Sequence, residues 1–201
     1  MEDQLSYPSL QLTVAAEALP LFTTVLQSGI EIKTAHGQTL AKFLNKFPGF
    51  TAEYLADVVQ TIFLNGTAVD DLSLPLTGDH PVLALSAAMP GLAGAIFRKN
   101  SFHSALRTET KSLKSSDEGH NSVLVTLKLF NSIARDRGQE LLQAGVCQKT
   151  DLFLSFLMRR PNLLQSIMAI QLADKKIDSK ELLQVLPELS RVNLKIVAEN
   201  G

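Results

Sequence analysis

The sequence predicts an α+β protein built from two related halves, and three observations carry that prediction. Segments in which apolar and polar residues alternate occur beside segments whose apolar residues recur at helical spacing. In the first half, the order strand, helix, short helix, hairpin and strand gives one small sheet and one main helix. The second half repeats several first-half segments in the same order. We therefore expect two domains, each a small mixed sheet packed on one main helix.

The regular structure of the first half is expected to include a strand followed by two helices. Residues 29–34, GIEIKT, alternate apolar and polar and predict the strand. One apolar helical stripe is predicted by four residues spaced i, i+3, i+4 and i+7, namely Leu40, Phe43, Leu44 and Phe47. Thr51 is expected to N-cap the second, short helix, AEYLADVV. Residues 18–28, ALPLFTTVLQS, fit a helix or a strand, and both interpretations stay open.

An Asn-Gly pair separates two apolar, strand-like pieces. Asn65-Gly66 is flanked by TIFL and TAV. A type I′ turn needs positive φ at both central residues, which Asn tolerates and Gly accepts without steric cost. The pair therefore predicts a β-hairpin, and residues 81–87, PVLALSA, predict a further strand. In the second half, residues 121–146 are typical of a strand that runs into a helix.

The internal repeat consists of four pairs of segments. Leu, Gln, Gly, Lys and Thr are shared by LQSGIEIKT and LQAGVCQKT, for example. The four pairs are residues 26–34 with 142–150, 43–48 with 156–161, 62–70 with 170–178, and 82–91 with 192–201. The polar stretch KSLKSSDEGHNS between the halves predicts a linker. The predicted domains are therefore residues 1–110 and 122–201, joined by residues 111–121.

Several short motifs lie close together between the predicted hairpin and the following strand. They are Asn65-Gly66, Val69-Asp70-Asp71, Pro75-Leu76, Gly78-Asp79 and the strand Val82–Ser86. With these motifs, residues 29–94 resemble the small β-grasp, ubiquitin-like sulfur carriers of the MoaD and ThiS type. The repeat suggests a diverged second copy at residues 122–201. The resemblance thus implies a fold of two tandem, diverged β-grasp-like repeats.

The chain departs from those carriers at the residue that performs their chemistry. The carriers end in a free Gly-Gly whose carboxylate is adenylated and then thiolated. Here Gly91 and Gly94 are followed by more chain, and Gly201 is preceded by Asn200 instead of a glycine. A degenerate or processed sulfur carrier that acts with an adenylating enzyme is therefore an alternative function and not the leading one.

Composition and charge bear on the partners and on the compartment. The formal net charge of −1 predicts no general attraction to nucleic acid or to a membrane. Nine acidic and three basic residues lie up to Phe97, against eleven acidic and sixteen basic from Arg98 onward, a pattern that would allow self-association. No apolar run approaches the roughly 18–20 residues of a membrane-spanning helix, and the N-terminal residues show no secretory signal. We expect a soluble, cytoplasmic protein with a protein partner.

No constellation of residues predicts catalysis, a cofactor or a metal site. Four histidines fall in expected turns or loops without convergent ligands, and they are His36, His80, His103 and His120. Cys147, the only cysteine, is expected to be a structural thiol. Residues 172–183, LADKKIDSKELL, superficially match a calcium loop, but Lys176 stands at a ligand position, so we exclude calcium. Ser179 is instead expected to N-cap a short helix.

Residues 89–111 form the most unusual segment, and the candidate binding site lies in it. Gly91 and Gly94 would expose backbone N–H groups that could form an anion-binding nest. Four basic residues follow, and they are Arg98, Lys99, His103 and Arg107. One interpretation is a phosphate or carboxylate pocket, or a docking strip for an acidic partner. The other is a connecting segment whose phenylalanines pack on the first domain.

From the sequence, the favoured function is a non-catalytic protein–protein interaction or adaptor module. It would use one face of a sheet together with the segment after Met89, because β-grasp domains offer an open edge strand and a solvated sheet face. A small anionic-ligand-binding domain around Arg98, His103 and Arg107 is the second alternative, beside the sulfur carrier.

Overall fold

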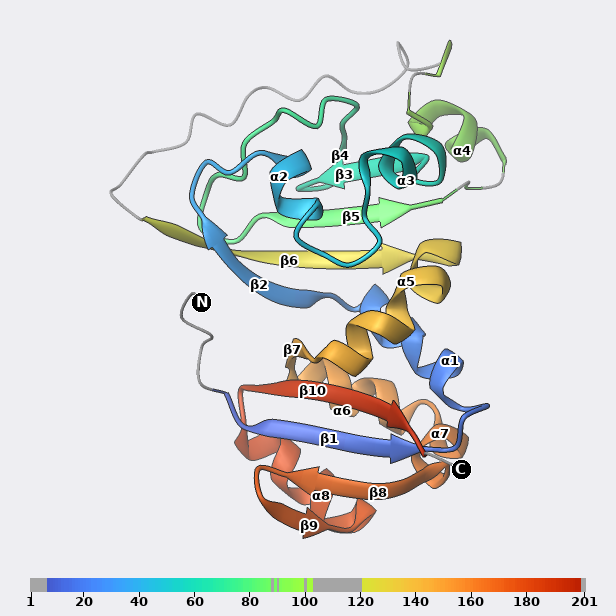
Figure 1. The fold of residues 1–201 in the computed structure, drawn as a ribbon, viewed down its shortest axis with the longest axis vertical. Coiled ribbons are helices and arrows are strands. Elements are labelled where there is room, and N and C mark those ends of the chain that lie inside the picture. The colour runs from blue at the N-terminus through green and yellow to red at the C-terminus, as the bar shows by residue number, and fades with distance from the viewer. Residues whose placement is uncertain (1–6, 88, 90, 100, 103–120, 200–201) are drawn as a thin grey trace. The chain divides into compact units, whose positions relative to one another are not determined.

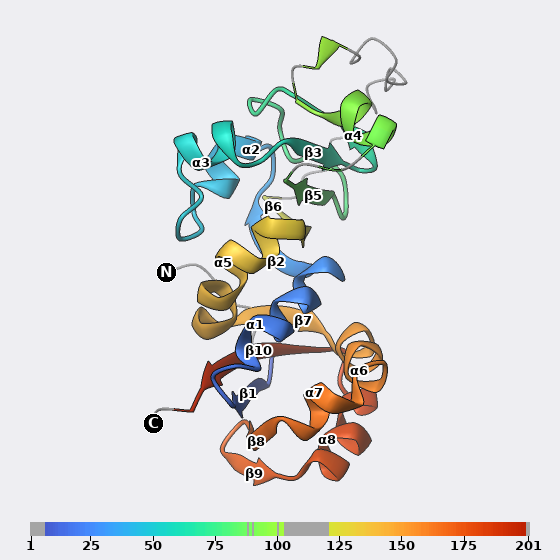
Figure 2. The same cartoon turned by 90° about the vertical axis from the view of Figure 1, so that its right-hand side faces the viewer.

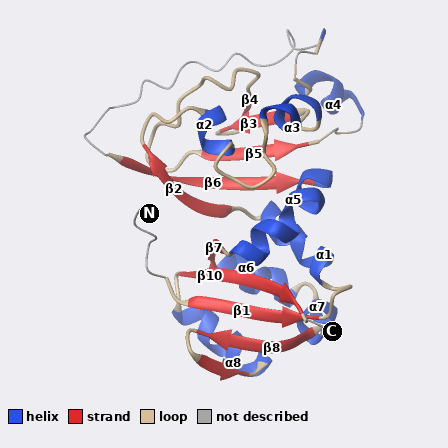
Figure 3. Cartoon of the chain, viewed as in Figure 1, coloured by secondary structure: helices blue, strands red, loops and turns tan. Residues whose placement is uncertain are grey.

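The chain forms two compact α+β units. The computed structural model describes residues 7–87, 89, 91–99, 101–102 and 121–199. One unit, here called the terminal unit, comprises residues 1–31 and 135–201, and the central unit comprises residues 32–134. Each unit is built around one five-stranded sheet of mixed strand direction (Figures 1 and 3). The predicted α+β class is confirmed at this level.

The sheet of the terminal unit has the strand order β7-β10-β1-β8-β9. Its strands are β1 (Ser9–Val14), β7 (Val146–Lys149), β8 (Ile167–Leu172), β9 (Lys175–Ile177) and β10 (Arg191–Ala198). The neighbours β1 and β10 are parallel, β7 is antiparallel to β10, and β8 is antiparallel to β1. Every second residue of β1 and β10 is buried, so both strands present one apolar face to the core.

Several helical segments accompany this sheet rather than one main helix. They are α1 (Leu19–Phe22), η1 (Thr23–Gln27), α5 (Asn131–Ala144), α6 (Thr150–Met158), α7 (Pro161–Gln165), α8 (Ser179–Val185) and η3 (Leu186–Glu188). The open interpretation of residues 18–28 is thereby decided in favour of helix. The predicted cap Ser179 was one residue off, because the side chain of Asp178 accepts from the Glu181 amide and closes a capping box.

The sheet of the central unit has the order β2-β6-β5-β3-β4. Its strands are β2 (Ile30–Ala35), β3 (Thr61–Leu64), β4 (Thr67–Ala68), β5 (Val82–Ser86) and β6 (Ser122–Phe130). The central pair β5 and β6 is parallel, and β3 is antiparallel to β5. The strands predicted at residues 29–34 and 81–87 and the strand that runs into a helix at residues 121–146 are all confirmed.

Of the described helices of the central unit, the first two begin where the sequence predicted, whereas the third lies in a segment for which the sequence predicted no helix. They are α2 (Leu40–Leu44), α3 (Ala52–Asp57) and α4 (Gly91–Phe97). The Thr51 side chain accepts from the Tyr54 amide at 3.1 Å, as the N-cap prediction required. The core of this unit contains fully buried residues from α2, β5 and β6, namely Leu40, Phe43, Leu44, Leu83, Leu85, Val125, Leu127 and Leu129. In Figure 2, α2 and α3 lie on one side of β3 and β5, and α4 lies on the other.

The Asn-Gly turn has the predicted geometry. Asn65 and Gly66 adopt φ values of 52° and 81°, and β3 and β4 pair antiparallel on either side. The Asn65 side chain adds an interaction that the sequence did not reveal. Its Oδ1 accepts from the Val82 amide at 2.8 Å, so the turn is tied to the start of β5.

The two units are not consecutive along the chain, in contrast to the predicted domains 1–110 and 122–201. The N-terminal strand β1 lies inside the sheet of the terminal unit, and β6 lies inside the sheet of the central unit. The chain passes between the units within β2 and within α5. The predicted linker lies outside the described residues except for Asn121. Among the described helices, none has both the length and the hydropathy of a bilayer-spanning segment.

Candidate functional site

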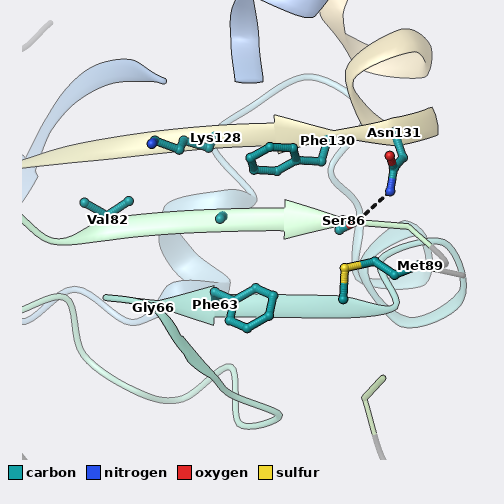
Figure 4. A pocket seen from close by; sticks show the side chains of 9 residues that line it. Phe63, Gly66, Val82, Ser86, Met89, Lys128, Phe130 and Asn131 are labelled. Atoms are coloured by element: carbon teal, nitrogen blue, oxygen red, sulfur yellow. Dashed lines mark hydrogen bonds between the residues drawn. The ribbon is translucent and has the colours of Figure 1, made fainter. Parts of the chain in front are cut away.

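A hollow lies on the face of the central sheet that is opposite α2 and α3. It has a volume of about 630 Å³, which is in the range of ligand pockets. Its lining comes from β3, β5, β6 and the residues that follow them: Phe63, Gly66, Val82, Ala84, Ser86, Met89, Lys128, Phe130 and Asn131 (Figure 4). We call this hollow the β5 groove, because the alternate residues of β5 form its floor.

The β5 groove exists because small side chains on the middle strand lie between large ones on its neighbours. In the strand register, Ala84 lies opposite Phe63 of β3 and Lys128 of β6. Ser86 lies opposite Phe130 in the same way. Side chains of directly opposite residues point to the same face, so a short residue between two long ones leaves a depression. The depression is therefore built into the register of three strands.

The walls of the groove are apolar and half-buried. The side chains of Phe63, Met89 and Phe130 lie around the short β5 side chains in Figure 4. Aromatic and methionine side chains supply a large apolar area, and methionine adapts its shape to a bound surface. Burial of this area would stabilise a complex through the hydrophobic effect.

One polar contact closes an end of the groove. Asn131 Nδ2 donates to Ser86 Oγ at 2.9 Å, and Ser86 is only 4% exposed. Asn131 is the first residue of α5 and has a positive φ of 55°, a conformation that Asn tolerates better than most residues. This hydrogen bond joins the end of β5 to the junction of β6 and α5. It therefore holds this end of the groove in place.

Among the described residues that line the groove, Lys128 carries a positive charge. It is half-buried, and it forms no ion pair with any residue that the structure describes. Its side chain extends along the sheet face in Figure 4. The aliphatic part of a lysine covers apolar surface while its ammonium group stays in water. The groove therefore combines an apolar surface with a positive charge that is not neutralised by a described neighbour.

The two glycines of the sequence-predicted site have structural roles at α4. Gly91 has a φ of 75° and begins this seven-residue helix. Gly94 packs against the chain before the helix, because a Cβ on it would lie 1.8 Å from the carbonyl oxygen of Met89. Gly94 and Arg98 also line a small pocket of about 200 Å³ next to Gln60 and Thr61.

The two basic residues that follow α4 bind the protein itself. Arg98 Nε donates to Gln60 Oε1 at 2.8 Å. Lys99 Nζ donates to the carbonyl oxygens of Leu55 at 2.5 Å and Ala56 at 3.2 Å, near the end of α3. Burial lowers the pKa of Lys99, partly offset by Asp70 and Asp57. His103 and Arg107 lie outside the described residues.

Cys147, the remaining titratable candidate, belongs to the terminal unit, whereas the groove belongs to the central unit. Cys147 on β7 is half-buried, and burial raises the pKa of its thiol to about 11, with a further contribution from Glu31. Among the described residues, no group of three or more histidine, cysteine or carboxylate side chains could hold a metal ion.

The binding site predicted from the sequence did not include the residues that line the β5 groove, apart from the general expectation of a sheet face. Phe63, Lys128 and Phe130 stand in apolar strand segments and were assigned to strands without a choice of face. One signal was available in the sequence of β6, where the polar residues Thr126 and Lys128 alternate with Val125, Leu127 and Leu129, and the structure buries these three apolar residues fully. That pattern predicts which residues share a face, but only the pairing with β5 and β3 brings them together.

Comparisons with known proteins give no relative. No family model matches the chain, no curated protein matches it, and no solved structure matches it.

Proposed function

We propose that this protein is a non-catalytic protein–protein interaction or adaptor module, and that its partner binds in the β5 groove. The observation that carries the proposal is the groove itself, an apolar hollow on the sheet face that α2 and α3 leave open. Its polar groups are few and lie at its margins, as is typical of binding sites. The sheet face and the residue Met89 both belong to the surface that the sequence favoured.

The α4 segment supports the same surface. Phe97 packs against Phe63 with a ring-centroid distance of 5.4 Å, so α4 lies beside the groove. The contacts of Arg98 and Lys99 with Gln60, Leu55 and Ala56 hold the end of α4 in place. Because Phe97 of α4 packs on Phe63, this wall residue of the groove is held in place and loses little conformational entropy when a partner binds.

We further propose that the fold is a tandem pair of β-grasp-like repeats with exchanged strands. Both sheets have an edge strand, a parallel central pair and an antiparallel hairpin at the other edge. Three of the four repeated sequence pairs fall on equivalent elements, namely β2 with β7, α2 with α6, and the β3–β4 hairpin with the β8–β9 hairpin. The fourth pair joins β5 and β10, which both belong to the parallel central pair of their sheets, but β5 lies next to the hairpin and β10 lies next to the edge strand. The strands β1 and β6 precede the two repeats, and each lies in the sheet of the other repeat.

Photo-crosslinking tests the proposed function. A photoreactive phenylalanine analogue in place of Phe130 should form a crosslink to a partner in cells that naturally contain this protein. Ala84→Phe in the same protein should abolish this crosslink, because the larger side chain fills the floor of the groove. Ala169→Phe is the matched control, because Ala169 is an exposed strand residue of the other sheet. If Ala84→Phe leaves the captured proteins unchanged while its thermal unfolding matches that of the control, the β5 groove is not the binding surface.

A further inference from the structure

We infer that the β5 groove receives an amphipathic helix of the partner, and that an acidic side chain on this helix pairs with Lys128. This inference rests on the proposed function and adds the shape and the charge of the ligand. Three features of the central unit carry it: the width of the groove, the helix that already packs on this face, and the charge of Lys128.

The width of the groove fits one helix. Its two walls stand on β3 and β6, which are the two neighbours of β5. Two strand spacings of about 4.8 Å place these walls roughly 10 Å apart at the backbone. An α-helix with its side chains measures about 10–12 Å across. One helix lying over the small residues Val82, Ala84 and Ser86 would therefore contact both walls.

The same sheet face already accepts a helix. Phe97 of α4 contacts Phe63, and Phe63 is also a wall of the groove. The opposite face is covered by α2 and α3 (Figure 2). A helix in the groove would extend the second layer that α4 begins, and a sheet with helices on both faces is a common architecture.

The positive charge of Lys128 indicates which charge the bound helix should carry. Its ammonium group forms no ion pair within the described chain, and its neighbours across the groove are the apolar residues Ala84 and Phe63. A basic ligand would bring like charges together in a partly apolar setting, which is unfavourable, whereas a glutamate or aspartate gains an ion pair. The expected ligand has apolar residues at helical spacing on one face and an acidic residue at the margin of that face.

Fluorescence anisotropy with two matched peptides tests the inference on the full-length protein. The acidic peptide, about 18 residues long, carries leucines at helical spacing and glutamates at the margins of the leucine face. The basic peptide has lysines in place of the glutamates. The wild-type protein should bind the acidic peptide more tightly than the basic one. Lys128→Met, which keeps the apolar stem, should weaken acidic-peptide binding by roughly twofold to fivefold. Lys128→Glu should reverse the preference.

A further variant separates this inference from the proposed function. Ala84→Phe should abolish binding of both peptides, and Ala169→Phe should not change it. If Ala84→Phe abolishes binding but the Lys128 variants leave the peptide preference unchanged, the assigned charge is wrong and the groove remains a binding surface. If Ala84→Phe has no effect on either peptide, the groove does not bind helices, and the inference fails. If the wild-type protein binds both peptides equally, the inference fails as well.

Discussion

The guanidinium group of Arg191 donates to both carboxylate oxygens of Glu31, a residue 160 positions earlier in the chain. Glu31 is 6% exposed, and Lys149 Nζ lies 3.6 Å from its Oε1. The pair lies within the terminal unit, at the last residue before the chain enters the central unit. The hydrogen bonds with Glu31 raise the pKa of Arg191. This ion pair also determines the electrostatic surroundings of Cys147.

We predict that Cys147 reacts slowly with iodoacetamide near neutral pH. Burial, Glu31 and Arg191 together place the pKa of this thiol at about 11, against an ordinary value of 9.0. The thiolate fraction at pH 8 is then lower by a factor on the order of 100. Glu31→Gln should accelerate labelling and Arg191→Met should slow it, because the two charges act on the pKa in opposite directions. Equal rates for the wild type and both variants in the folded state would contradict this assignment.

The same thiol should make the protein less stable at alkaline pH. The unfolded thiol loses its proton near pH 9, whereas the folded thiol keeps it up to about pH 11. Between these values the unfolded state binds fewer protons, so the free energy of unfolding falls as the pH rises. Urea denaturation at pH 8, 9 and 10 measures this effect. Cys147→Ser serves as the comparison and should have a flatter stability profile in this range.

Gly138→Ala should destabilise the terminal unit. Gly138 lies in α5, and a Cβ on it would lie 2.7 Å from Thr23 Cβ and 2.9 Å from Leu26 Cδ1. At an exposed helix position, replacement of glycine by alanine would stabilise the protein by up to about 1 kcal/mol, because alanine has the higher helix propensity. Here we expect a loss of roughly 1–3 kcal/mol from overpacking. Glu140→Ala, at an exposed position of the same helix, should be nearly neutral in thermal unfolding. A Gly138→Ala protein more stable than the wild type would show that α5 does not pack tightly on η1.

Substitution of either residue of the Asn-Gly turn should destabilise the protein, and the physical reason should differ between the two positions. Gly66→Ala creates no clash, since nothing lies within 4 Å of the added Cβ, but its φ of 81° should cost about 1–2 kcal/mol. Asn65→Gly keeps the turn and loses the hydrogen bond to the Val82 amide, at a cost of about 1 kcal/mol. Asn65→Asp retains an acceptor and should stay close to the wild type. Chemical denaturation of the three variants measures these differences, and equal losses for Asn65→Gly and Asn65→Asp would exclude a role for the side-chain bond.

Cleavage of the chain within residues 111–121 should not separate the two fragments. The N-terminal fragment supplies β1 to the terminal sheet, between β10 and β8 of the other fragment. The C-terminal fragment supplies β6 to the central sheet, between β2 and β5. Each fragment therefore completes a sheet of the other. A protease site introduced in this segment, followed by size-exclusion chromatography of the cut protein, tests the prediction. Elution of two separate fragments without denaturant would contradict the strand order.

Local structure was predictable from the sequence wherever a few adjacent residues decide it. The Asn65-Gly66 turn follows from backbone sterics, and the Thr51 cap follows from the need to satisfy a free amide at a helix start. The candidate site was not predictable in the same way. Lys99 was proposed as a ligand-binding residue, but its ammonium group donates to carbonyl oxygens of residues 55 and 56, more than forty positions earlier. Such a contact depends on where α4 lies and leaves no local pattern.

By itself, the sequence determined the α+β class, the hairpin, the positions of most strands and the starts of α2 and α3. These features depend on alternation, helical spacing and turn chemistry, which act over a few residues. Only the tertiary structure decided that β1 lies between β10 and β8, that β6 lies between β2 and β5, and that Ala84 lies between Phe63 and Lys128. The physical reason is that an amphipathic strand can complete any sheet with a matching apolar face. Its partners are chosen by the packing of the whole chain.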